Sequence, residues 1–108
     1  MIVLNLFVGS LVLAVATPVL AGLRLTDSQF VQASRCQALA RATSLGVADA
    51  AAYNALVKVQ RQGRADYVVD RASDAVIVVS GQARRAEGTA RADLIAERDG
   101  PCQALLAR

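Results

Sequence analysis

The first 23 residues contain no charged side chain, and this run decides how much of the chain is left to build a folded domain. Residues 2–16 have the length of the apolar region of a signal peptide, and Pro18 would end a helix directly behind it. Two small residues follow at the positions that a signal peptidase reads, Val19 and Ala21. We therefore expect residues 1–21 to be a signal peptide that is removed on export.

An uncleaved membrane anchor is the alternative, because 23 uncharged residues are long enough to cross the roughly 30 Å apolar core of a bilayer as a helix. No Lys or Arg precedes the apolar run, and Arg24 and Arg35 behind it favour a cytoplasmic flank. We favour cleavage because several residues dilute the run, namely Asn5, Gly9, Ser10 and Pro18. The chain is thus expected to be periplasmic or secreted, with inner-membrane anchoring as the alternative.

The remainder, residues 22–108, has the composition of one small helical domain. All 12 Lys and Arg and all 9 Asp and Glu fall there, which leaves a net charge of +3. Its aromatic side chains are few: Phe30, Tyr53 and Tyr67. Chains this short bury only about 60–65% of the surface that the unfolded state exposes, so a covalent cross-link would help.

Two cysteines offer that cross-link. Cys36 and Cys102 are 66 positions apart, which rules out a CxxC redox pair, and without histidine they are too few for a structural zinc site. In an oxidising compartment we expect a disulfide, which stabilises a fold by about 4 kcal/mol when it closes a loop of this length. In the cytoplasm both would be reduced and would act as small buried apolar side chains.

The pattern that follows predicts an all-α fold of four to five helices. A first helix begins at Thr26, which forms a capping box with Gln29, while Leu25 and Phe30 fit a hydrophobic staple. Its apolar face would comprise Phe30, Ala33, Cys36, Leu39 and Ala40. Gly46 is the expected stop.

A second helix is expected from Val47 to Gly63, with a narrow apolar stripe of Ala48, Ala52, Ala55 and Val59. The third has a longer stripe at helical spacing: Val68, Ala72, Ala75, Val79, Ala83 and Ala86. Residues 75–79 are rich in β-branched side chains and would also suit a strand, but the stripe continues on both sides of them and favours a helix.

The C-terminal part predicts two shorter helices. A bend or break of the third helix is expected near Gly81 or Gly88, and residues 89–98 form a further helical piece. Pro101 follows a turn and suits the first position of a last helix, which carries Cys102, Leu105 and Leu106.

One acidic row is a weak metal candidate. Asp66, Asp70 and Asp74 are four residues apart, so a helix would align three carboxylates that could ligate a hard cation. Such a row is also typical of a solvated face, Arg71 can pair with Asp74, and no EF-hand loop surrounds it. We therefore predict no metal and no cofactor.

Catalytic patterns are weaker still. A serine nucleophile would have to be activated by the single lysine, Lys58, and no motif links that lysine to Ser28, Ser34, Ser44, Ser73 or Ser80. The carboxylates that could serve glycoside hydrolysis are at ordinary surface-helix spacings: Glu87, Asp93, Glu97 and Asp99. We therefore expect no enzyme.

The basic residues near the second helix end, Lys58, Arg61 and Arg64, could bind an anionic partner, but their position fits compensation of the helix dipole. The sequence thus predicts a non-catalytic binding or structural envelope protein. Its partner would be another envelope protein or a second copy, with no nucleic acid, and with membrane contact only if residues 1–21 stay attached. A membrane-anchored regulator is the alternative, and a divalent-cation-binding protein or small enzyme is less favoured. No residue motif identifies a family.

Overall fold

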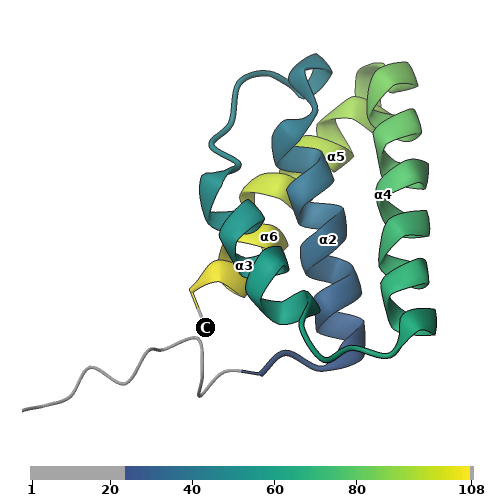
Figure 1. Ribbon diagram of the computed structural model, residues 1–108. Helices are drawn as coiled ribbons and strands as arrows, with labels where there is room; N and C mark the ends of the chain where they lie inside the picture. Colours follow the sequence, from purple (N-terminus) through teal and green to yellow (C-terminus); the bar gives the residue numbers. More distant parts are fainter. Residues whose placement is uncertain (1–23, 108) are drawn as a thin grey trace, which may run out of the picture.

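The computed structural model describes residues 24–107, and the predicted signal peptide lies outside the described residues. Six helical elements follow one another: α2 (Asp27–Arg41), the 3-10 turn η1 (Thr43–Leu45), α3 (Ala51–Arg61), α4 (Asp66–Arg85), α5 (Gly88–Asp99) and α6 (Pro101–Leu106) (Figure 1). Residues 24–107 contain no strand, so the predicted all-α class is confirmed. Within the same range, no helix has the length and apolar character needed to cross a membrane.

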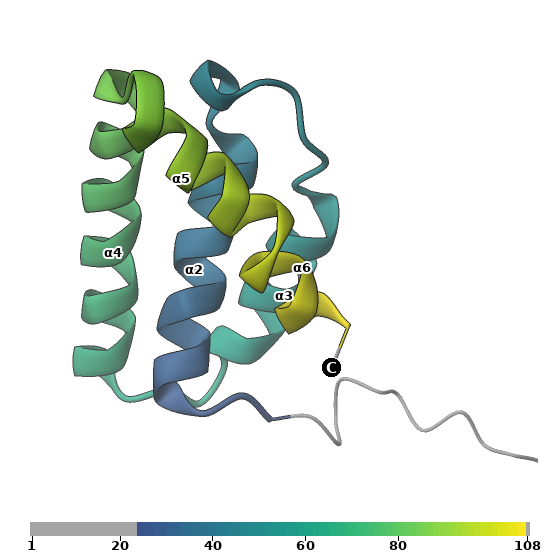
Figure 2. The same ribbon diagram turned by 180° about the vertical axis from the view of Figure 1, so that it is seen from behind.

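Helix α2 is the centre of the bundle, and α3, α4, α5 and α6 all pack against it (Figures 1 and 2). The predicted capping box is present, since Gln29 N donates to Thr26 Oγ1 and Thr26 N donates to Gln29 Oε1. Every residue of the predicted face is buried: Phe30, Ala33, Cys36, Leu39 and Ala40. The helix ends at Arg41, before the predicted stop at Gly46, and the 3-10 turn carries Leu45 into the core.

Helices α2 and α4 lie side by side and run in the same direction (Figure 1). Near their N-terminal ends Phe30 packs with Val68 and Ala72 in a small apolar cluster. At the other end Ser44 Oγ donates to the carbonyl of Ala83. The C-terminal ends of two long helices therefore lie together, at one end of the molecule.

Helix α4 confirms the helical prediction for residues 75–79 and continues through Gly81. The break comes later, because the chain is extended at Ala86 and Glu87 before Gly88, at φ 54°, begins α5. Most of the predicted stripe is buried, with Val68, Ala72, Val79 and Ala83 in the core.

The prediction for the second helix was wrong in its start and in its buried face. Helix α3 begins at Ala51, while Val47 stands fully exposed in the preceding loop. Three members of the predicted stripe are exposed, Ala52, Ala55 and Val59. The helix instead buries Tyr53 and Gln60, with Leu56 and Val57 partly covered. Larger side chains remove more apolar area from water than alanine does, so they determine which face turns inward.

The last helix is held by the predicted disulfide. Pro101 occupies the first turn of α6, as expected, and Cys102 is bonded to Cys36 with their Cα atoms 5.6 Å apart. Both sulfur-bearing residues are completely buried. The bond therefore attaches the end of the chain to the middle of the central helix.

Candidate functional site

The acidic row lies on α4 and faces solvent. Asp66, Asp70 and Asp74 are all exposed. Within residues 24–107, no group of three or more His, Cys, Asp or Glu side chains is arranged to hold a metal ion. The row is a charged, solvent-facing part of the α4 surface.

Of the four carboxylates considered for acid–base work, Glu97 and Asp99 are bound by arginines, while Glu87 and Asp93 are exposed. Glu97 on α5 binds Arg35 on α2 through two hydrogen bonds of 2.6 and 2.9 Å, and Gln32 Nε2 donates to it at 3.3 Å. The bond from Arg35 lowers the pKa of Glu97, against partial burial, and raises the pKa of Arg35 in turn. Asp99 is bound in the same way by Arg98, whose hydrogen bond lowers the pKa of Asp99. The Arg35–Glu97 pair therefore joins α2 to α5, whereas Arg98 and Asp99 are neighbours within α5.

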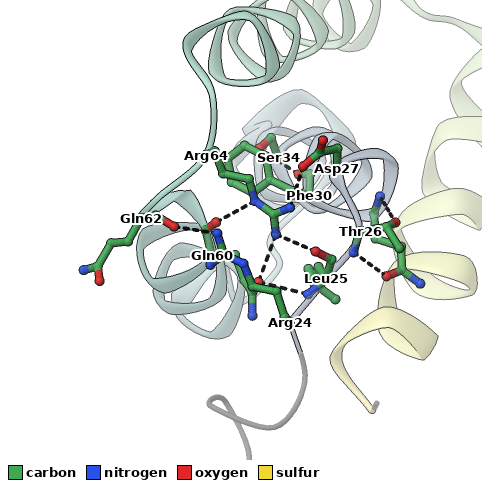
Figure 3. Close-up of polar contacts among 10 residues, drawn as sticks. Arg24, Leu25, Thr26, Asp27, Phe30, Ser34, Gln60, Gln62 and Arg64 are labelled. Carbon is green, nitrogen blue, oxygen red and sulfur yellow. Dashed lines mark hydrogen bonds and ion pairs between the residues drawn. The ribbon is translucent and has the colours of Figure 1, made fainter.

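Of the three basic residues considered near the end of the second helix, Lys58 and Arg61 are exposed, but the Arg64 side chain is buried where α2, α3 and α4 approach one another (Figure 3). Its side chain is only 4% exposed. The guanidinium donates to the Asp27 carboxylate at 2.8 Å and to the carbonyls of Leu25 and Gln60 at 2.7 and 2.9 Å. It also lies 5.0 Å from the centre of the Phe30 ring. Arg64 therefore holds the start of α2 in place and is not open to a partner.

A second buried arginine fastens α5 to the turn after α2. Arg98 Nη1 donates to the Leu45 carbonyl at 3.0 Å, and Arg91 donates to the Ser44 carbonyl from two nitrogens at 3.3 Å. These carbonyls lie beyond the end of α2, where intrahelical donors are missing. Neither arginine was predicted to do this, because the sequence does not show which carbonyl lies nearby.

The described surface carries a groove between the C-terminal ends of α2 and α4. It has a volume of about 420 Å³, within the range of small-ligand sites. Its residues come from α2, η1 and α4: Gln37, Ala38, Arg41, Ala42, Thr43, Ser44, Val76, Ser80 and Arg84. The lining thus combines small and apolar side chains with hydroxyl groups. Two arginines, one from α2 and one from α4, also line the groove. We call it the α2–α4 groove.

The charge of the α2–α4 groove is positive. None of the residues that border it is Asp or Glu, and Arg41 and Arg84 are exposed and form no ion pair with another residue in the range 24–107. Each helix C-terminus contributes roughly half a negative charge. Two such ends offset about one of the two guanidinium charges, so a net positive charge remains for a ligand.

Sequence reasoning missed Arg41 and Arg84 as a pair. Each stands in the last turn of its helix, where a basic residue is ordinary. Only the parallel packing of α2 and α4 brings the two last turns together, and nothing in a single sequence indicates that packing.

No protein-family model, curated protein or solved structure matches the chain.

Proposed function

We propose that this is a non-catalytic, exported binding protein that holds an anionic group of another envelope component in the α2–α4 groove. One observation carries the proposal: Arg41 and Arg84 flank a groove free of bordering carboxylates. Guanidinium groups bind carboxylate and phosphate through paired hydrogen bonds. The hydroxyls of Thr43 and Ser80 would supply further donors at the same place.

Binding is tested by nuclear magnetic resonance, titrating the protein with inorganic phosphate at constant ionic strength. We expect the Nε–Hε signals of Arg41 and Arg84 to shift together and to saturate. The double variant Arg41→Gln/Arg84→Gln should lose the saturable shift. A matched variant, Arg61→Gln/Arg71→Gln, changes two exposed arginines outside the groove and should retain it. Equal, non-saturating shifts of all exposed arginines would show that phosphate only screens the surface.

Export is the second part of the proposal. It is supported by the uncharged N-terminal run and by the buried disulfide, since disulfides persist chiefly outside the cytoplasm. Intact-mass spectrometry of the envelope fraction should show a chain beginning at Gly22 whose mass rises by two hydrogens on reduction. Full-length chains in the cytosol with both thiols free would contradict it.

A further inference from the structure

The outward side of α4 carries apolar side chains that nothing in the described part of the chain covers. Tyr67, Ile77 and Val78 are 65%, 69% and 54% exposed. In both ribbon views α4 stands at the edge of the bundle, and it packs chiefly against α2 (Figures 1 and 2). The apolar residues share this side with two aspartates and an arginine. We define the outer face of α4 as six exposed residues, Tyr67, Asp70, Asp74, Ile77, Val78 and Arg85, together with Gly81, which is buried next to the Arg85 guanidinium.

The outer face of α4 is ordered by charge along the helix. Asp70 and Asp74 occupy its N-terminal half beside the exposed Arg71, which leaves that half net negative. Ile77 and Val78 form its middle, and Arg85 its C-terminal end. These positions repeat at spacings of three and four residues, the periodicity of helices that pair along a seam. A surface that is negative at one end, apolar in the middle and positive at the other end complements its own reversed copy.

We propose that two copies of this chain associate through the outer faces of α4, with the two helices antiparallel. A twofold axis between Ile77 and Val78 brings the apolar middles together. The same axis places Asp70 level with Arg85 of the second copy and Asp74 level with its Gly81. A parallel arrangement would instead oppose aspartate to aspartate and Arg85 to Arg85, which is unfavourable.

The position of the Arg85 side chain fits this register. Its Nη1 lies 3.1 Å from the point that a Cβ on Gly81 would occupy, so the guanidinium covers Gly81 on the outer face. In the antiparallel pair this guanidinium lies between Asp70 and Asp74 of the second copy. Because Gly81 has no side chain, there is room at this point for the Arg85 guanidinium, which both Asp70 and Asp74 of the second copy can reach.

The association is tested by sedimentation velocity on the oxidised protein, expressed as the full chain and measured over a range of concentrations. The contact involves one face of one helix, so we expect a dimer that dissociates in the micromolar range. Ile77→Lys should raise the dissociation constant at least about tenfold, since it places a charge in the apolar middle. Val47→Lys, at a fully exposed valine outside this face, is the matched control and should leave dimerisation unchanged.

A charge exchange tests the orientation. Arg85→Asp makes the ends of the face negative, and Asp70→Arg/Asp74→Arg makes them positive. Each variant alone should be monomeric, while an equimolar mixture should form a heterodimer. Circular dichroism checks that both variants are folded, which is expected because all three side chains are exposed.

A monomer at every concentration would overturn the proposal, as would a dimer that Ile77→Lys leaves intact. Failure of the mixed variants to associate would overturn the antiparallel orientation. Arg41 is not involved and Arg84 is unchanged in every variant, so the phosphate titration of the α2–α4 groove remains an independent measurement.

Discussion

Arg64 shows how a single charged side chain is made compatible with burial. A buried guanidinium must be matched by acceptors, and Asp27, Leu25 and Gln60 supply them within 3.1 Å. These contacts fix the chain where it enters α2, next to the capping box. A single residue of the loop between α3 and α4, Arg64, thus holds the N-terminal end of the central helix in place.

Replacing Arg64 by lysine should destabilise the fold by about 2–3 kcal/mol, because an ammonium group cannot reach the same set of acceptors. Urea denaturation followed by circular dichroism measures the loss. Arg61→Lys, an exposed change on the neighbouring helix, is the control and should have no effect. Equal midpoints for the two variants would contradict the role assigned to Arg64.

The buried hydroxyl group of Tyr53 contributes no hydrogen bond to the fold within residues 24–107. The side chain is 1% exposed, and its hydroxyl has no hydrogen-bond partner within residues 24–107. Burial, together with the charge of Asp99, raises the pKa of Tyr53. Tyr53→Phe should therefore leave stability unchanged or raise it by up to about 1 kcal/mol. Thermal unfolding measures this, with the exposed change Tyr67→Phe as control, and a clear loss at position 53 would reveal a bond to the hydroxyl.

Between elements, the pair formed by Arg35 and Glu97 makes the contact of α2 with α5 sensitive to acid. The pKa of Glu97 is lowered in the folded state, so the pair stabilises the fold fully above the ordinary glutamate pKa of about 4.3. That stabilisation is lost as the pH falls through the lower, folded-state pKa. Both side chains are about a quarter exposed, which limits the effect to about 1 kcal/mol.

Unfolding by urea at a series of pH values tests this assignment. From neutral pH down to pH 3 the wild type should lose about 1 kcal/mol more than Glu97→Gln, since the variant has no carboxylate to protonate there. Asp93→Asn, at an exposed carboxylate of the same helix, should follow the wild type. A wild type and Glu97→Gln with parallel pH profiles would contradict the assignment.

The helices also differ in how well they could be predicted from the sequence. The start of α2 was predictable because a capping box is a local signal, and α4 because its stripe extends over five turns. Helix α3 was misjudged because alanines at regular spacing suggest a seam, whereas Tyr53 and Leu56 remove more apolar area from water. A regular pattern of small residues is thus a weaker guide than the position of a few large ones.

For the whole molecule, the bond between Cys36 and Cys102 is the main constraint on the unfolded state. Because the cysteines are 66 positions apart, the bond should contribute about 4 kcal/mol. In urea denaturation, the free energy of unfolding of the double variant Cys36→Ala/Cys102→Ala should be lower than that of the wild type by most of this amount. Since both cysteines are fully buried, a mild reductant should leave the folded wild type unchanged and act only when denaturant is added. Rapid reduction without denaturant would contradict this.

The pairing of the cysteines was predictable because there are only two of them. The α2–α4 groove and the outer face of α4 were not, since both depend on how whole helices pack. The acidic row was visible in the sequence, and its exposure on α4 became clear only once the position of that helix was known. Local signals indicate elements, whereas sites formed between elements require the assembled chain.

The loop at Val47 lies inside the ring that the disulfide closes, between Cys36 and Cys102. A protease that cut this exposed loop would therefore produce two fragments that still migrate as one molecule. Only a reducing gel would separate them, so an apparently intact band from a non-reducing gel says nothing about whether the backbone is continuous.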